Sequence, residues 1–162
     1  MIQSVKKEIG GELGFGEICE MASECDIPSV VDCNDDRFLA PSNMTEEVRN
    51  ACRETGQQVP EGVAEVASVI YQSLAKCYAE TARQLEGVTG QKYDCIHIVG
   101  GGSNAEYLNR LTAEATGIPV YAGPAEATAI GNVAVQMITA GELSGLQDAR
   151  ACVFRSFPIN RY

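Results

Sequence analysis

The chain has 162 residues, in which 12 lysines and arginines stand against 22 aspartates and glutamates, so its formal net charge is −10. A chain of this length buries enough surface to hold a core without disulfides or metal, which excludes a stapled mini-protein. The negative charge would repel nucleic-acid phosphates and anionic membranes, so we expect neither as a partner. No apolar stretch approaches the roughly 18 residues that a membrane span requires, and no signal peptide is evident, which predicts a cytoplasmic location.

The first half of the chain predicts mainly helices. Apolar spacing and glycine punctuation favour helices over Ile2–Ile9 and Phe15–Cys25, and Val30-Val31 could form a brief strand. Asn43 has the spacing of a helix cap toward Glu46, and that helix should continue to Gly56. The charged run at residues 34–37 favours a turn with an ion pair over a catalytic carboxylate pair.

A long helix follows in the middle of the chain. Pro60 and Glu61 suit its first turn, and it should run to about Gly87. Its apolar residues recur every three or four positions, a stripe that is typical of core packing. We therefore expect this helix to lie against the core along its length.

The second half alternates strands and helices around glycines. Cys95–Val99 is a short apolar run that predicts a buried strand, and Ile118–Tyr121 predicts a second strand. Between them we expect a helix that Ser103 or Asn104 caps and Gly117 ends, and after them a helix over Ala127–Ala140. This order predicts a βαβ unit and therefore an α/β fold.

Three consecutive glycines, Gly100, Gly101 and Gly102, separate the first predicted strand from the helix. Without Cβ atoms, a ligand can approach the backbone N–H groups directly, and a helix N-terminus favours a phosphate. The alternative is a glycine turn kept for tight packing of strand on helix. The spacing alone leaves both interpretations open.

The residues around the glycines exclude one nucleotide motif and weaken another. No Gly-Lys-Ser or Gly-Lys-Thr follows, so the turn is not a P-loop. Gly100, Gly102 and Ala105 fit the relaxed dinucleotide pattern G-x-G-x-x-A, but that site needs an acidic residue at the end of the second strand. Glu126 falls about one turn too late, which disfavours an NAD site.

Seven cysteines and one histidine are the remaining reactive side chains. The cysteines form no C-x-x-C pair, so we expect reduced thiols and no metal site. His97 lies in the apolar run and is expected to be a core residue without a catalytic role. Glu126 is expected to cap the following helix in preference to binding a ligand or magnesium.

Several segments together resemble the C-terminal domain of the FGGY carbohydrate kinases. They are residues 96–104, 108–111, 117–120, 122–127 and 131–132, with residues 34–38, 51–55 and 73–75 in the same order and spacing. The resemblance implies a ribonuclease-H-like, actin-like ATPase fold, helix-rich with a small sheet. It also implies that residues 1–162 are a C-terminal nucleotide-binding segment, without the N-terminal sugar-binding domain and its aspartate base.

The resemblance further implies ATP and Mg²⁺ as cofactors and transfer of the γ-phosphate to a sugar hydroxyl. Gly101 corresponds to a backbone contact with the nucleotide, in the turn that includes Gly100 and Gly102, and Gln3 corresponds to a glutamine contact with ATP. No catalytic residue carries over, so the segment alone is expected to be inactive. A related kinase for another ketose or polyol, and a non-catalytic nucleotide-binding module, stay open as alternatives.

Cysteine pairs found in some members of the family do not carry over. Thr112 and Thr116 stand where one such pair would be, and Val69 stands at the position of a partner for Cys52. We therefore expect none of these family disulfides.

Overall fold

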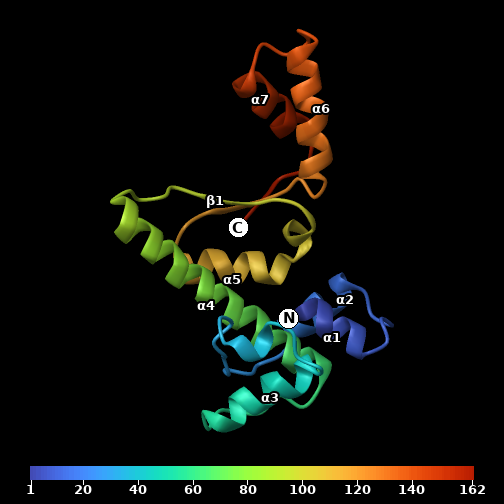
Figure 1. Ribbon diagram of the computed structural model, residues 1–162, viewed down its shortest axis with the longest axis vertical. Helices are drawn as coiled ribbons and strands as arrows, with labels where there is room; N and C mark the ends of the chain where they lie inside the picture. The colour runs from blue at the N-terminus through green and yellow to red at the C-terminus, as the bar shows by residue number, and fades with distance from the viewer. The chain divides into compact units, whose positions relative to one another are not determined.

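A computed structural model describes residues 1–162, and the chain divides into two compact units. The first unit contains residues 1–92 and 105–117, and the second contains residues 93–104 and 118–162. No helix combines the length and apolar character that a membrane crossing requires. Figure 1 shows the elements in chain order.

The first unit is helical and is built around one long helix. Its elements are α1 (Ile2–Glu8), α2 (Phe15–Ser23), the 3₁₀ turn η1 (Asp36–Phe38), α3 (Met44–Glu54), α4 (Val63–Thr89) and α5 (Glu106–Thr116). Helices α1, α2, α3 and α5 all contact α4. The helices expected over Ile2–Ile9, Phe15–Cys25 and the Asn43–Gly56 region are confirmed within two residues, and Asn43 accepts the predicted cap bond from the Glu46 N–H.

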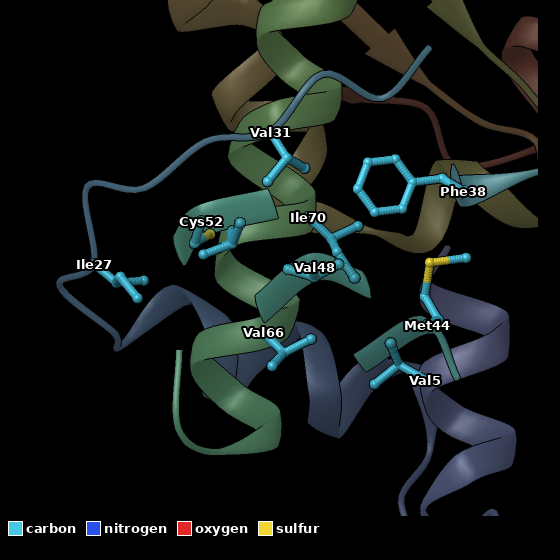
Figure 2. Packing of buried hydrophobic residues seen from close by; sticks show 10 residues of the cluster. Val5, Ile27, Val31, Phe38, Met44, Val48, Cys52, Val66 and Ile70 are labelled. Atoms are coloured by element: carbon cyan, nitrogen blue, oxygen red, sulfur yellow. The ribbon is translucent and has the colours of Figure 1, made fainter. Parts of the chain in front are cut away.

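Two apolar clusters hold the first unit together. In the larger one, Val66 and Ile70 of α4 pack with Val48 and Cys52 of α3 and with Val5 of α1, all fully buried (Figure 2). The smaller one joins α2, α4 and α5 through Ile18, Ala22, Ala67, Tyr71, Leu108 and Leu111. Burial of such aliphatic side chains stabilises a fold by about 1.5–3 kcal/mol each, so α4 is the main support of this unit.

The predicted strand at Val30-Val31 is wrong. The backbone of Val30 pairs with a side chain and not with another strand. The Gln57 amide accepts a hydrogen bond from the Val30 N–H at 2.9 Å and donates one to the Val30 carbonyl at 2.8 Å. The Val31 N–H donates to the Ser73 hydroxyl at 2.9 Å. Side chains satisfy the backbone groups of this buried segment, so it needs no sheet.

The long helix starts later than predicted and is buried over only part of its length. Pro60 and Glu61 precede α4, because their carbonyls accept hydrogen bonds from the Arg49 guanidinium instead of starting the helix. Gly87 lies inside α4, which ends at Gly90 in the left-handed conformation typical of a C-cap. No buried residue follows Ala79 in α4, so the prediction of a core stripe to Leu85 is wrong for the last turns.

The second unit contains a small mixed sheet and two helices. Its strands are β1 (Ile96–Ile98), β2 (Val120–Ala122) and β3 (Asn160–Arg161), and its helical elements are η2 (Gly101–Asn104), α6 (Ala127–Thr139) and α7 (Leu146–Ser156). The sheet order is β1-β2-β3, with β1 parallel to β2 and β3 antiparallel to it. The sequence pattern does not predict helix α7 or strand β3.

The chain therefore has the fold class that the sequence predicts, helix-rich α/β with a small sheet. The parallel pairing of Ile96 with Val120 and of Ile98 with Ala122 confirms the expected βαβ order. The expected burial of the first strand is wrong. Ile96 and Ile98 are half-buried and His97 is exposed, because β1 is an edge strand with β2 on one side only.

Candidate functional site

The glycine turn at the end of β1 is tied to the loop that follows β2. The Gly100 N–H donates to the Pro124 carbonyl at 3.1 Å, and the Gly123 N–H donates to the Ile98 carbonyl at 2.8 Å. Gly100 has φ of +77°, a left-handed conformation that favours glycine. Both loops leave the carboxyl ends of parallel strands, the edge where open α/β sheets bind their ligands.

Ser103 fixes the shape of the turn. Its buried hydroxyl donates to the Gly100 carbonyl at 2.7 Å, and its N–H donates to the same carbonyl at 3.0 Å. The prediction that Ser103 or Asn104 caps the next helix is therefore wrong, since both lie in η2 and Ala105 holds the N-cap position of α5. Gly117 ends α5 as predicted.

Two amides of the turn face no acceptor of the chain. The N–H groups of Gly101 and Gly102 make no hydrogen bond to any of its atoms, and both residues are exposed. A Cβ at Gly101 would meet nothing within 4 Å, and Gly101 does not have a positive φ. Neither backbone conformation nor packing within this chain requires glycine at position 101, so the turn keeps an open approach to two free donors.

Helix α6 begins directly after the Gly123–Ala125 loop and adds a second source of positive potential. Its first-turn amides lack intrahelical acceptors, which gives the helix start about half a positive charge. Glu126 occupies the expected N-cap position, but its carboxylate makes no capping hydrogen bond, so its predicted role as a cap holds for position only. The carboxylate is exposed at the start of α6.

Gln3 belongs to the first unit and the glycine turn belongs to the second. Gln3 is an exposed residue of α1, and its side-chain amide makes no hydrogen bond within the chain. The free amide is available to a ligand, whereas its neighbour Val5 on the same helix is fully buried.

His97 lies on an exposed face of the sheet, so its expected core position is wrong. Its ring stacks on Tyr121 with centroids 5.5 Å apart, and the Arg161 guanidinium lies 5.9 Å from the centre of the Tyr121 ring. The Cys95 sulfur is 3.4 Å from His97 Nε2. In a strand, residues two apart point to the same face, so Cys95 and His97 lie side by side. The spacing between cysteines does not reveal this contact, because the partner is a histidine.

The acidic run at residues 34–37 forms the expected turn with an ion pair. The Asp35 carboxylate accepts hydrogen bonds from the Arg37 N–H at 2.9 Å and from Arg37 Nε at 3.0 Å. The backbone bond, followed by the guanidinium, lowers the pKa of Asp35 below its ordinary value. Arg37 also pairs with Glu54 at 2.8 Å, so these carboxylates serve a structural ion-pair network.

The chain contains no cluster of three or more histidine, cysteine, aspartate or glutamate side chains arranged to hold a metal ion. All seven cysteines are free thiols. Mg²⁺ in proteins is usually bound through one or two carboxylates together with substrate phosphates.

Residues 14–140 match the family model described as the FGGY family of carbohydrate kinases, C-terminal domain. This match covers most of the chain, including the glycine turn and α6, and the chain belongs to that family.

The chain is similar over its whole length to several bacterial rhamnulokinases. It is 44% identical to one from Ligilactobacillus salivarius, 40% to one from Halalkalibacterium halodurans and 41% to one from Bacillus subtilis. These alignments cover 100%, 100% and 98% of this chain, but 34%, 35% and 33% of the respective relatives. The chain thus spans about a third of the length of the curated relatives that it matches.

Proposed function

We propose that this chain is the nucleotide-binding C-terminal part of an ATP-dependent sugar kinase, in which Gly100, Gly101 and Gly102 hold the phosphates of ATP. The observation that carries the proposal is the pair of N–H groups at Gly101 and Gly102, which make no hydrogen bond within the chain and belong to exposed residues without side chains. Two backbone donors and a helix start suit a polyanion, because each hydrogen bond to a charged oxygen contributes about 1.5–3 kcal/mol.

In this proposal, the segment positions ATP and stabilises the negative charge of its phosphates. ATP supplies the γ-phosphoryl group when bound, and positioning and electrostatic stabilisation account for most of the catalysis of such a transfer. The turn amides donate to phosphate oxygens, and the exposed Gln3 amide is proposed as a second contact with ATP. Mg²⁺ is proposed to accompany ATP, where it would bind the phosphate oxygens and neutralise part of their charge.

The proposed substrate is L-rhamnulose, phosphorylated at its 1-hydroxyl. This assignment rests on the names of the relatives, which are rhamnulokinases at 40–46% identity. The sugar and the catalytic base are expected on the N-terminal domain, so the 162-residue segment alone should not phosphorylate sugar. Kinases for xylulose, glycerol or fuculose are the alternatives within the family, and a non-catalytic nucleotide-binding module is the alternative outside it.

Gly101→Val in the full-length protein tests the nucleotide site. The branched side chain should occupy the open approach and raise the KM for ATP by about tenfold or more, with the KM for the sugar unchanged. Gly87→Val is a matched control, because Gly87 is also exposed, has no positive φ and has nothing within 4 Å of its Cβ position. Equal ATP kinetics in the two variants would refute the proposed site.

A substrate panel separates the site from the substrate. The full-length protein is assayed with L-rhamnulose, L-xylulose, L-fuculose and glycerol at saturating ATP. Preference for another member of the panel would overturn the rhamnulose assignment and leave the nucleotide site standing. Absence of phosphorylation with every member, together with measurable ATP binding, would favour the non-catalytic module.

A further inference from the structure

We infer that Cys33 and Cys77 form a paired thiol site that reacts with a disulfide oxidant and closes into an intramolecular disulfide. Both cysteines line one polar cavity of about 300 Å³ in the first unit, between the irregular segment after α2 and the middle of α4. Both are partly exposed free thiols. The site is independent of the proposed nucleotide contacts.

The register between the two segments places the sulfurs together. The Val31 N–H donates to the Ser73 hydroxyl at 2.9 Å, which fixes one pair of positions. Asn34 contacts Cys77, one turn further along α4 than Ser73, and Cys33 lies between Val31 and Asn34 in the chain. Contacts on both sides of Cys33 therefore hold it against the stretch of α4 that carries Cys77, and both side chains line the same cavity.

Asn34 gives a second, independent link between the segments. Its amide nitrogen donates toward the Cys77 sulfur at 3.6 Å, and the residue directly before it in the chain is Cys33. The Cys77 thiol in turn donates toward Asn34 Oδ1 at 3.9 Å, and its sulfur opens to the cavity. The thiolate is the form that attacks disulfides, and burial disfavours it at Cys33, so we assign the first attack to Cys77 and the second to Cys33.

Burial, together with nearby negative charge, keeps Cys33 protonated at rest. Burial raises the pKa of Cys33 to about 11, with further contributions from Cys77 and Asp32 and an opposing one from the N-terminal ammonium. Lys76 and Glu80 also line the cavity, and the phenol of Tyr78 interacts with both cysteines, its own pKa raised mainly by burial. When the Cys77 sulfur is held in a mixed disulfide it carries no charge, so its contribution to the pKa of Cys33 disappears.

The reaction balances with glutathione disulfide as the oxidant. The Cys77 thiolate attacks one sulfur of glutathione disulfide, and the S–S bond breaks to release one glutathione, which takes up the proton lost by Cys77. The Cys33 thiolate then attacks the Cys77 sulfur, and the second glutathione leaves with the proton from Cys33. Two protein thiols are oxidised to one disulfide, and one glutathione disulfide is reduced to two glutathiones.

Peptide mass spectrometry tests the inference on the intact chain. The protein is incubated with glutathione disulfide, alkylated, and digested with trypsin and an Asp-specific protease without reduction. Cleavage after Lys76 and Arg83 leaves residues 77–83 with Cys77 as their one cysteine, and cleavage before Asp32 and Asp35 leaves residues 32–34 with Cys33. We expect these two peptides to be joined, and to be joined faster at pH 9 than at pH 7 because Cys33 must lose its proton.

Single variants complete the test. Cys33→Ser and Cys77→Ser should each abolish the cross-link, whereas Cys25→Ser, a partly exposed cysteine of the same unit, should retain it. The cross-link should also raise the melting temperature of the oxidised chain by roughly 5–10 °C, since it closes a loop of more than 40 residues. The inference would be overturned if the wild-type chain gave residues 32–34 and 77–83 only as separate glutathione adducts. It would also be overturned if these peptides were joined only to other cysteines.

Discussion

Gly123 and Pro158 approach so closely that the position of Gly123 has no room for a side chain. An ideal Cβ on Gly123 would lie 2.6 Å from the Pro158 carbonyl oxygen. Gly123 also has φ of +127°, a conformation that L residues rarely adopt. The carbonyl belongs to the chain that enters β3, so this contact joins the end of β2 to the start of β3.

Gly123→Ala should destabilise the second unit. The added methyl group meets a backbone oxygen, which cannot move without displacing β3, and the positive φ costs about a further 1–2 kcal/mol. We expect the free energy of unfolding to fall by about 2 kcal/mol or more, measured by urea denaturation with circular dichroism.

Gly131→Ala is the control from the same unit. Gly131 lies inside α6, is exposed, and has nothing within 4 Å of its Cβ position. Alanine there should leave stability unchanged or raise it by up to about 1 kcal/mol, because glycine is the poorer helix former. Equal losses in the two variants would show that the Pro158 contact has no special importance.

Gln57→Leu should destabilise the first unit. The substitution keeps the approximate size of the side chain but removes both hydrogen bonds to Val30, leaving a partly buried N–H and carbonyl without their partners. A loss of about 1–3 kcal/mol is expected from denaturation midpoints. The exposed side chain of the adjacent Gln58 makes no hydrogen bond, so Gln58→Leu should change stability by less than about 0.5 kcal/mol.

The Asp35 ion pair should make stability depend on acid pH. The backbone N–H and guanidinium of Arg37 lower the pKa of Asp35 in the folded chain, so the stabilisation is complete above the ordinary aspartate pKa of about 3.9. It is lost as the pH falls below that value and through the folded pKa. Urea midpoints between pH 6 and pH 2.5 should therefore fall less steeply for Asp35→Asn than for the wild type. Asp36→Asn, which changes an exposed carboxylate without a hydrogen bond, should retain the wild-type slope.

Gly101→Val should change nucleotide kinetics without changing folding. Position 101 has no positive φ, and an added Cβ would meet nothing within 4 Å, so we expect valine to be accommodated without backbone strain. The melting temperature should stay within about 2 °C of the wild type in the absence of nucleotide. A large drop would mean that the glycine is required for packing of the turn, the alternative left open by the spacing of the residues.

The sequence predicts the elements whose signals are local. Apolar periodicity locates α1, α2, α3 and α6, and Gly117 marks the end of α5. The glycine turn is also visible in the sequence, since three glycines directly after a short apolar run indicate the end of a strand. The candidate site follows from this turn and from the resemblance of the surrounding segments to one family.

The errors arise where long-range side-chain contacts replace local patterns. Gln57 pairs with Val30 across 27 residues, and Arg49 takes the carbonyls that precede α4, neither of which a periodicity can reveal. Ser103 is used inside the glycine turn, so it is not available as a helix cap. Strand β3 is only two residues long, too short to show alternation, and its pairing with Tyr121 and Ala122 depends on the whole second unit.

The pairing of Tyr162 with β2 also decides how much of the small sheet depends on the residues that follow α7. Tyr162 exchanges two backbone hydrogen bonds with Val120, at 3.0 and 3.2 Å, and Val120 is the first residue of β2, whereas Gly123 and the glycine turn lie beyond the other end of that strand. The segment from Asn160 to Tyr162 therefore covers the side of β2 that β1 leaves unpaired. Deletion of the final five residues would remove β3 and leave the N–H and the carbonyl of Val120 without their partners.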